Sequence, residues 1–246
     1  MYPIPRRLAA AAIVAIIPVA GIGAAGVQPP ERIKQAVERE LRGERELREL
    51  EVTVDGSEVT LAGRLRTFWE KSEAIRRTFE VDGVETVASE IVVPIEEDQE
   101  RLVEEVVKAI QRYPHYRVWD YIDGNIDNGA VTIFGAVTPE RDKEREIFER
   151  IAKIRGVQDV QMNVTTLSPS SGDRRIRASI GGQIARSHHF ERYAVMKNPP
   201  FHIIVNNGVA TLVGYVQGDI ERMELQRIVA QTQGVLRVEN QLQTVQ

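Results

Sequence analysis

The sequence has no cysteine in its 246 residues. Disulfide bonds, thiolate metal sites and a lipid attached to cysteine are therefore excluded. A nucleophile motif, a phosphate-binding loop and a dinucleotide fingerprint are also missing. Glutamate and arginine are frequent, but they lie mainly on helical stretches such as 140–150, where opposite charges normally form a solvated face. We therefore expect a non-enzymatic protein that uses no cofactor and no metal.

Near the N-terminus, the uncharged stretch from Leu8 to Val27 is just long enough to span a bilayer. Arg6 and Arg7 precede this run, and small residues at 23–26 resemble a signal peptidase site. The pattern predicts an export signal over residues 1–26 that is cleaved. The alternative is a segment that is retained as an N-terminal anchor.

Basic residues are fewer than acidic ones, 32 against 36. The net charge is −4, and removing the two signal arginines makes it −6 for the mature chain. A nucleic-acid partner is not expected, because binding phosphates requires a net basic face. Attraction to an anionic membrane would have to come from a local basic patch.

One short pattern occurs three times. The copies are VTLAGRL at 59–65, VTIFGAV at 131–137 and ATLVGYV at 210–216, and each has one central glycine, at Gly63, Gly135 and Gly214. An Asp-Gly or Asn-Gly pair precedes each central glycine by six or seven residues, and such pairs favour tight hairpin turns. These pairs are Asp55-Gly56, Asn128-Gly129 and Asn207-Gly208. Each copy therefore predicts two adjacent antiparallel strands.

A second glycine follows 20 or 21 residues later, at Gly83, Gly156 and Gly234, and opens a valine-rich strand pattern. A helix is expected between the two glycines, with the later glycine at its end. In the first copy Thr67 and Glu70 form a capping box, and in the second Thr138 is the expected cap before Pro139. Apolar residues four apart predict another helix at the start of each copy. They are Ile33, Val37 and Leu41; Leu102, Val106 and Ile110; and Ile176, Ile180 and Ile184.

Each copy thus predicts the order helix, strand, strand, helix, strand. The fold class is α+β, with three tandem small αββαβ domains, each packing two helices on a three-stranded mixed sheet. The predicted domains are 29–94, 99–168 and 173–246, after the signal or anchor at 1–26. The linkers at 94–98 and 167–173 separate them.

These motifs resemble the BON domain, a family named for an osmotically inducible periplasmic protein and nodulation-related proteins. The resemblance rests on the central glycine after the hairpin and on the later glycine-valine strand, and it covers the chain from about 31 to 245. It implies an envelope protein that contacts phospholipid membranes or other envelope components, often in osmotic stress. All six glycines are taken as fold determinants. The third copy departs from the pattern at 195–201, where Pro199 and Pro200 predict a displaced or irregular first strand.

Half of the aromatic residues gather, with basic residues, where the first helix of the second and third copies meets the first strand. The candidate contact residues are Arg112, Tyr113, Tyr116, Arg117 and Trp119, and Arg186, His188, His189, Phe190, Arg192 and Tyr193. One interpretation is a membrane-interface contact, in which rings enter the headgroup layer and arginines meet phosphate. The other is that the rings close the domain cores or the seams between them.

The function expected from the sequence is phospholipid binding by a periplasmic or envelope protein, supporting envelope integrity or tolerance of osmotic stress. The alternative is an envelope scaffold or holdase chaperone that binds proteins and no lipid. Several weak contacts on linked domains would add to one another through effective concentration. The sequence predicts no oligomeric state.

Overall fold

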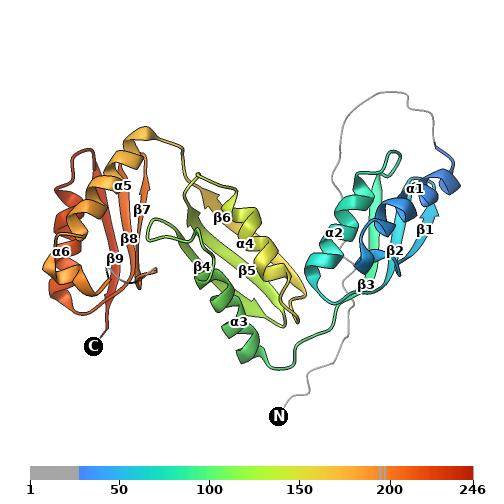
Figure 1. Ribbon diagram of the computed structural model, residues 1–246, viewed down its shortest axis with the longest axis horizontal. Coiled ribbons are helices and arrows are strands. Elements are labelled where there is room, and N and C mark those ends of the chain that lie inside the picture. The colour runs from blue at the N-terminus through green and yellow to red at the C-terminus, as the bar shows by residue number, and fades with distance from the viewer. Residues whose placement is uncertain (1–27, 194–195, 197, 246) are drawn as a thin grey trace, which may run out of the picture. The chain divides into compact units, whose positions relative to one another are not determined.

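A computed structural model describes residues 28–193, 196 and 198–245 (Figure 1). The predicted signal or anchor at 1–26 lies outside the described residues. Among the helices described, none combines the length and the apolar character that crossing a membrane requires. The chain divides into two compact parts, residues 1–96 and 97–246.

The first part holds one αββαβ unit. Its elements are α1 (Pro30–Arg42), the 3-10 helix η1 (Arg45–Leu47), β1 (Glu51–Asp55), β2 (Glu58–Arg64), α2 (Phe68–Phe79) and β3 (Thr86–Val92). The apolar stripe predicted on α1 is buried, with Ile33, Val37 and Leu41 in the core. One half of the predicted capping box is present, since Thr67 accepts from the Glu70 N–H at 3.3 Å. The Glu70 carboxylate accepts at 2.8 Å from the N–H of Arg66, one residue before the cap, and not from that of Thr67.

The second part holds two further units. The second unit consists of α3 (Gln99–Gln111), β4 (Tyr121–Asp127), β5 (Ala130–Val137), α4 (Lys143–Ala152) and β6 (Asp159–Thr166). The third consists of α5 (Ser171–Ile184), the 3-10 helix η2 (His188–Tyr193), β7 (Phe201–Asn206), β8 (Val209–Val216), α6 (Asp219–Ala230) and β9 (Arg237–Thr244). Each sheet lies inside one predicted domain, although the second and third units share one compact part.

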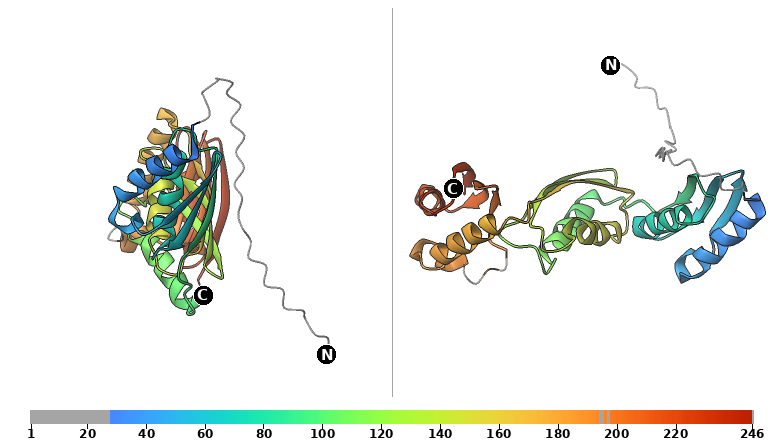
Figure 2. Two further views of the ribbon diagram at one scale, coloured as in Figure 1. Left: turned by 90° about the vertical axis from the view of Figure 1, so that its right-hand side faces the viewer. Right: turned by 90° about the horizontal axis from the view of Figure 1, so that it is seen from above.

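All three sheets are mixed, as predicted. The hairpin strands pair antiparallel, and the last strand of each unit pairs parallel with the middle one. Two helices cover one face of each sheet (Figure 2). The expectation of a displaced or irregular first strand in the third unit was wrong, because β7 pairs with β8 without interruption from Phe201 to Asn206. The extra residues lie before β7.

Two predictions about helix ends were also wrong. Thr138 does not cap α4, which begins at Lys143 behind the cap residue Asp142. The later glycine does not end the helix either, because α2, α4 and α6 stop four residues before Gly83, Gly156 and Gly234. These glycines instead have φ values of 91–95° in the turn that leads into the last strand.

The central glycines have steric reasons for lacking a side chain. Gly135 has φ 140°, and a Cβ there would lie 2.0 Å from the Tyr121 carbonyl oxygen. Gly214 has φ 98°, and a Cβ there would lie 2.3 Å from the Pro200 carbonyl oxygen. Both positions face the start of the neighbouring strand, so any side chain would push the hairpin apart.

Candidate binding site

The second unit inserts a short segment, residues 117–120, into the third. Val118 and Trp119 pack against the core of the third unit, between α5 and β7. Trp119 lies over Gly181 of α5, where an added Cβ would be 3.3 Å from the indole. The Ile203 N–H of β7 donates to the Val118 carbonyl at 2.7 Å. An extended segment of one unit therefore fills the helix–strand groove of the next.

A buried ion pair anchors this segment to its own unit. Asp120 is fully buried, and both its carboxylate oxygens accept from the Lys143 ammonium at 2.8 Å. Asp120 also accepts from the N–H and hydroxyl of Thr138. The sequence analysis missed this group because its members come from three separate places in the chain. Its one sequence signal was an acidic residue between Trp119 and Tyr121, among apolar neighbours.

Tyr116 and His202 form a second link across the seam between these units. The Tyr116 hydroxyl accepts from the Ile122 N–H at 3.3 Å and lies 3.4 Å from Nε2 of His202. Burial raises the pKa of Tyr116 and lowers the pKa of His202. His202 is thereby favoured in its neutral form, in which Nε2 can accept a hydrogen bond from the Tyr116 hydroxyl.

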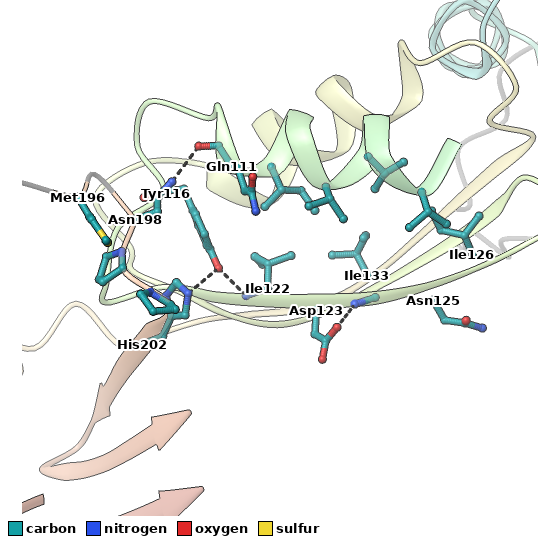
Figure 3. Close-up of a pocket in the computed structure, with 17 residues that line it drawn as sticks. Gln111, Tyr116, Ile122, Asp123, Asn125, Ile126, Ile133, Met196, Asn198 and His202 are labelled. Atoms are coloured by element: carbon teal, nitrogen blue, oxygen red, sulfur yellow. Dashed lines mark hydrogen bonds between the residues drawn. The ribbon is translucent and has the colours of Figure 1, made fainter. Parts of the chain in front are cut away.

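Beside this link lies an open groove between α3 and β4, with a volume of about 880 Å³ (Figure 3). Ile122, Ile126 and Ile133 point toward α3, whereas Asp123 and Asn125 point to the other side of the strand. The third unit closes one end, where Asn198 donates to the Gln111 carbonyl at 2.8 Å. Ligand sites in proteins commonly enclose ~300–1,000 Å³ and are mainly apolar, as this groove is.

The groove exists because α3 has two apolar stripes. Leu102 and Val106 are buried and face the core of the unit. A second stripe of Val103, Val107 and Ile110 lines the groove, and Val103 and Val107 remain 43% and 44% exposed. The corresponding residues of α1 are charged, at Lys34 and Glu38, so the first unit has no such stripe.

The structure places four of the candidate aromatic residues in the interior. Tyr113 and Tyr116 are buried in the second unit, and Phe190 and Tyr193 in the third. The Tyr113 hydroxyl donates to Glu146 at 2.5 Å, and the Tyr193 hydroxyl to Glu221 at 2.7 Å. Burial and the Glu221 hydrogen bond raise the pKa of Tyr193 to about 12. These rings close cores and seams, and they do not face outward as a membrane contact would require.

The remaining candidates are more accessible. Arg112, Arg117, Arg186, Arg192 and His188 are exposed, while Trp119 and His189 are partly buried. Arg192 pairs with Glu221 and Gln217, so its charge is engaged within the third unit. A lipid contact through the exposed residues stays a prediction.

The groove has few titratable lining residues. Its titratable lining residues are Asp123, Tyr116 and His202, and the last two are committed to each other. In the part of the chain that the structure describes, no group of three or more His, Cys, Asp or Glu side chains is placed to hold a metal ion. The lining of the groove suits an apolar group.

A family model of the BON domain matches residues 31–94 and 172–246, which together are more than half of the chain. The chain belongs to the BON domain family. The matched BON segments are the first and third units, whereas the predicted second BON copy at 99–168 is not matched. A comparison with curated proteins found no significant match.

Two solved structures align with most of this BON chain. One is the C-terminal domain of CdsD, a structural protein of the type III secretion system of Chlamydia trachomatis. It is 14% identical, with 86% of this chain and 96% of that chain covered and a TM-score of 0.24. The other is the periplasmic domain of the type III secretion inner-membrane protein PrgH from S. typhimurium. It is 12% identical, with coverage of 84% and 99% and a TM-score of 0.21. Likenesses this weak carry no argument about fold or function.

Proposed function

We propose that this protein is an exported, non-enzymatic envelope protein that acts as a binding scaffold and captures a partner protein in the α3–β4 groove. The periplasmic or envelope location rests on membership of the BON family and on the signal-like or anchor-like N-terminus. Phospholipid binding is the second candidate. A holdase activity would use the same groove.

The observation that carries the scaffold proposal is the second apolar stripe of α3. Exposed valines at 103 and 107 gain nothing for the core of the second unit, and contiguous exposed apolar surface marks interaction sites. The groove beside them is open and mainly apolar, and polar residues such as Gln111 and Asn198 line one end of it. A site of this composition suits an apolar group of another molecule.

We further infer that residues 99–168 are a BON copy that has diverged from the family model. The second unit has the same element order as the matched units and the same strand order, with the hairpin antiparallel and the last strand parallel. Its central glycine, Gly135, pairs as Gly214 does, opposite the beginning of the first strand. Divergence at the α3 stripe fits a unit specialised for a partner.

Binding to phospholipid is favoured by one specific observation. Arg112, Arg117 and Arg186 are exposed, and none of them forms an ion pair with another described residue. Free guanidinium groups can meet lipid phosphates, each contributing ~1 kcal/mol near an anionic surface. This lipid contact would support envelope integrity or tolerance of osmotic stress, and it would act together with the binding of a partner in the groove.

Photocrosslinking in the native cells separates the two candidates. A benzophenone amino acid replaces Val107 in the full-length chain, and a matched variant carries it at Ile220, which is 65% exposed on α6. The scaffold proposal expects a discrete protein adduct from position 107 that is missing from position 220. Equal labelling at both positions, or no protein adduct at all, would refute it.

The lipid candidate is checked with flotation on phosphatidylethanolamine–phosphatidylglycerol vesicles. Flotation of the purified chain that disappears when Arg112, Arg117 and Arg186 become glutamate would favour lipid binding through these arginines. If the chain stays at the bottom of the gradient at low salt, the lipid candidate fails.

A further inference from the structure

The outer edge of β4 has backbone groups that no strand pairs. The hairpin turn at Asn128 and Gly129 makes Asp127 and Ala130 the first hydrogen-bonded pair, and such pairs recur at every second residue. Ile122, Gly124 and Ile126 therefore direct their N–H and C=O groups away from β5. Because β4 pairs only with β5, these groups lie at the edge of the sheet.

Side-chain oxygens satisfy part of this edge. The Ile122 N–H donates to the Tyr116 hydroxyl, and the Gly124 N–H donates to the Asp123 carboxylate at 2.8 Å. The groove is lined by every residue from 122 to 126. A lining that includes consecutive residues of a strand runs along its edge, since the side chains of one face alone would alternate.

The third unit contains an internal example of a peptide on the equivalent edge. Ile203 lies opposite Leu212, two residues before the central Gly214, just as Gly124 lies opposite Ile133, two residues before Gly135. The Ile203 N–H donates to a carbonyl of another segment, that of Val118, at 2.7 Å. Gly124 therefore occupies the position at which this fold accepts a peptide carbonyl.

The side-chain part of the example matches as well. Trp119, next to the donated carbonyl, lies over Gly181 of α5. Counting from the aligned stripes Leu102–Val106 and Ile176–Ile180, Gly181 corresponds to Val107. The same helix–strand groove thus holds a bulky apolar side chain in the third unit, whereas in the second unit it is lined by Val103 and Val107 and stays open.

Two acidic side chains lie on β4, on the face of the strand that points away from α3. Asp123 and Asp127 are exposed on β4, and neither forms an ion pair with a described residue. A basic side chain at the flank of an incoming segment would complement them.

We infer that the α3–β4 groove binds an extended peptide segment of another protein, which adds a strand to the edge of β4 and places a bulky apolar side chain against Val107. A carbonyl of this peptide accepts from the Gly124 N–H and replaces the Asp123 carboxylate as its partner. This inference rests on the proposed scaffold function, because it states which partner chemistry the groove holds. A lipid chain could fill the apolar volume, but it has no alternating donors and acceptors for the strand edge.

The test uses the purified full chain and two synthetic peptides. The probe has the sequence Lys-Val-Thr-Trp-Thr-Val-Lys with blocked ends, so that apolar side chains alternate and lysines flank them. The control peptide has the same side chains but carries N-methyl groups on the two threonine amides, which removes the N–H donors that strand pairing needs. We expect binding of the probe to slow hydrogen exchange at Gly124 and Ile126, and N-methylation to weaken binding at least tenfold, or ~1.4 kcal/mol.

Variants locate the site. Val107→Glu places a charge in the groove at a position that is already 44% exposed, so the fold is expected to survive, as circular dichroism would verify. It should weaken binding of the probe at least as much as N-methylation does, whereas Ile220→Glu on α6 should leave binding unchanged.

Equal binding of both peptides would overturn the strand pairing and leave a groove that captures apolar groups, so the scaffold proposal would survive alone. If Val107→Glu binds the probe as tightly as the unchanged chain does, or if the probe does not slow hydrogen exchange in β4, the peptide does not bind in the α3–β4 groove. Protection of β4 by phosphatidylglycerol vesicles but not by the peptide would replace the peptide with lipid.

Discussion

Buried charged residues hold the segment 117–120 in place within the second unit, out of contact with water. Asp120 and Lys143 are the sharpest case, because both are almost completely buried and each is the other's counter-ion. A buried pair of this kind has high desolvation costs, which its attraction and hydrogen bonds offset only while both partners are present.

Removing one partner should therefore be costly. Lys143→Met leaves the Asp120 carboxylate buried without a counter-charge, and we expect the free energy of unfolding to fall by about 3–5 kcal/mol. The double variant Asp120→Asn with Lys143→Met removes the unpaired charge and keeps an oxygen for the Thr138 N–H, so it should regain more than half of this loss. Urea unfolding measures both. A double variant no more stable than the single one would show that the charge is not the cause.

At the scale of elements, the segment 117–120 acts as a connector between a sheet and its neighbour. It leads into β4 of its own unit, while Val118 and Trp119 pack between α5 and β7 of the next. The glycine at 181 makes room for the indole, since a side chain there would occupy the space of Trp119. Helix–strand packing in the third unit therefore depends on a residue from the second.

Trp119→Ala should loosen the second and third units together. Because Trp119 is only partly buried, we expect a loss of about 2–3 kcal/mol, below the ~3–5 kcal/mol of a fully buried aromatic residue. Faster hydrogen exchange is expected in both α5 and β4, with no change in β1 to β3. The matched variant is Trp69→Ala in α2, which should affect only the first part of the chain. A Trp119→Ala effect confined to the second unit would contradict the role of the connector.

Turn pairs, glycine spacing and apolar periodicity together predicted the order of α-helices and β-strands in each repeat, but not the 3-10 helices η1 and η2. The same reasoning missed the seam. Asp120, Thr138 and Lys143 meet only after the hairpin and α4 have packed, and the docking of Trp119 on Gly181 joins residues of different units. The groove did leave a signal, since Val103 and Val107 replace the charged Lys34 and Glu38 of the first copy.

At the scale of the whole molecule, the two compact parts differ in their titratable groups. All four histidines lie in 97–246, at His115, His188, His189 and His202, and residues 1–96 contain none. Burial lowers the pKa of His202 below its ordinary value of 6.5. The unfolded chain therefore binds a proton at His202 more readily than the folded one, so stability declines as the pH falls below 6.5.

Acidification from pH 8 to pH 5.5 should consequently destabilise only residues 97–246, by at most ~1.4 kcal/mol per pH unit for one proton. Each part has one tryptophan, so the fluorescence of Trp69→Phe follows the second part and that of Trp119→Phe follows the first. His202→Gln should remove most of the slope of the second transition. An equal acid shift in the first part, or an unchanged slope in His202→Gln, would refute this assignment.

The tether on Trp119 has a consequence for stoichiometry. A side chain that the same polypeptide holds in the groove competes with free molecules as though it were present at roughly millimolar concentration. Free molecules at micromolar concentration would seldom displace Trp119, so the α5–β7 groove stays occupied by a residue of its own chain. Residues 97–246 should therefore engage one partner molecule at a time, and higher valency would require several chains to assemble.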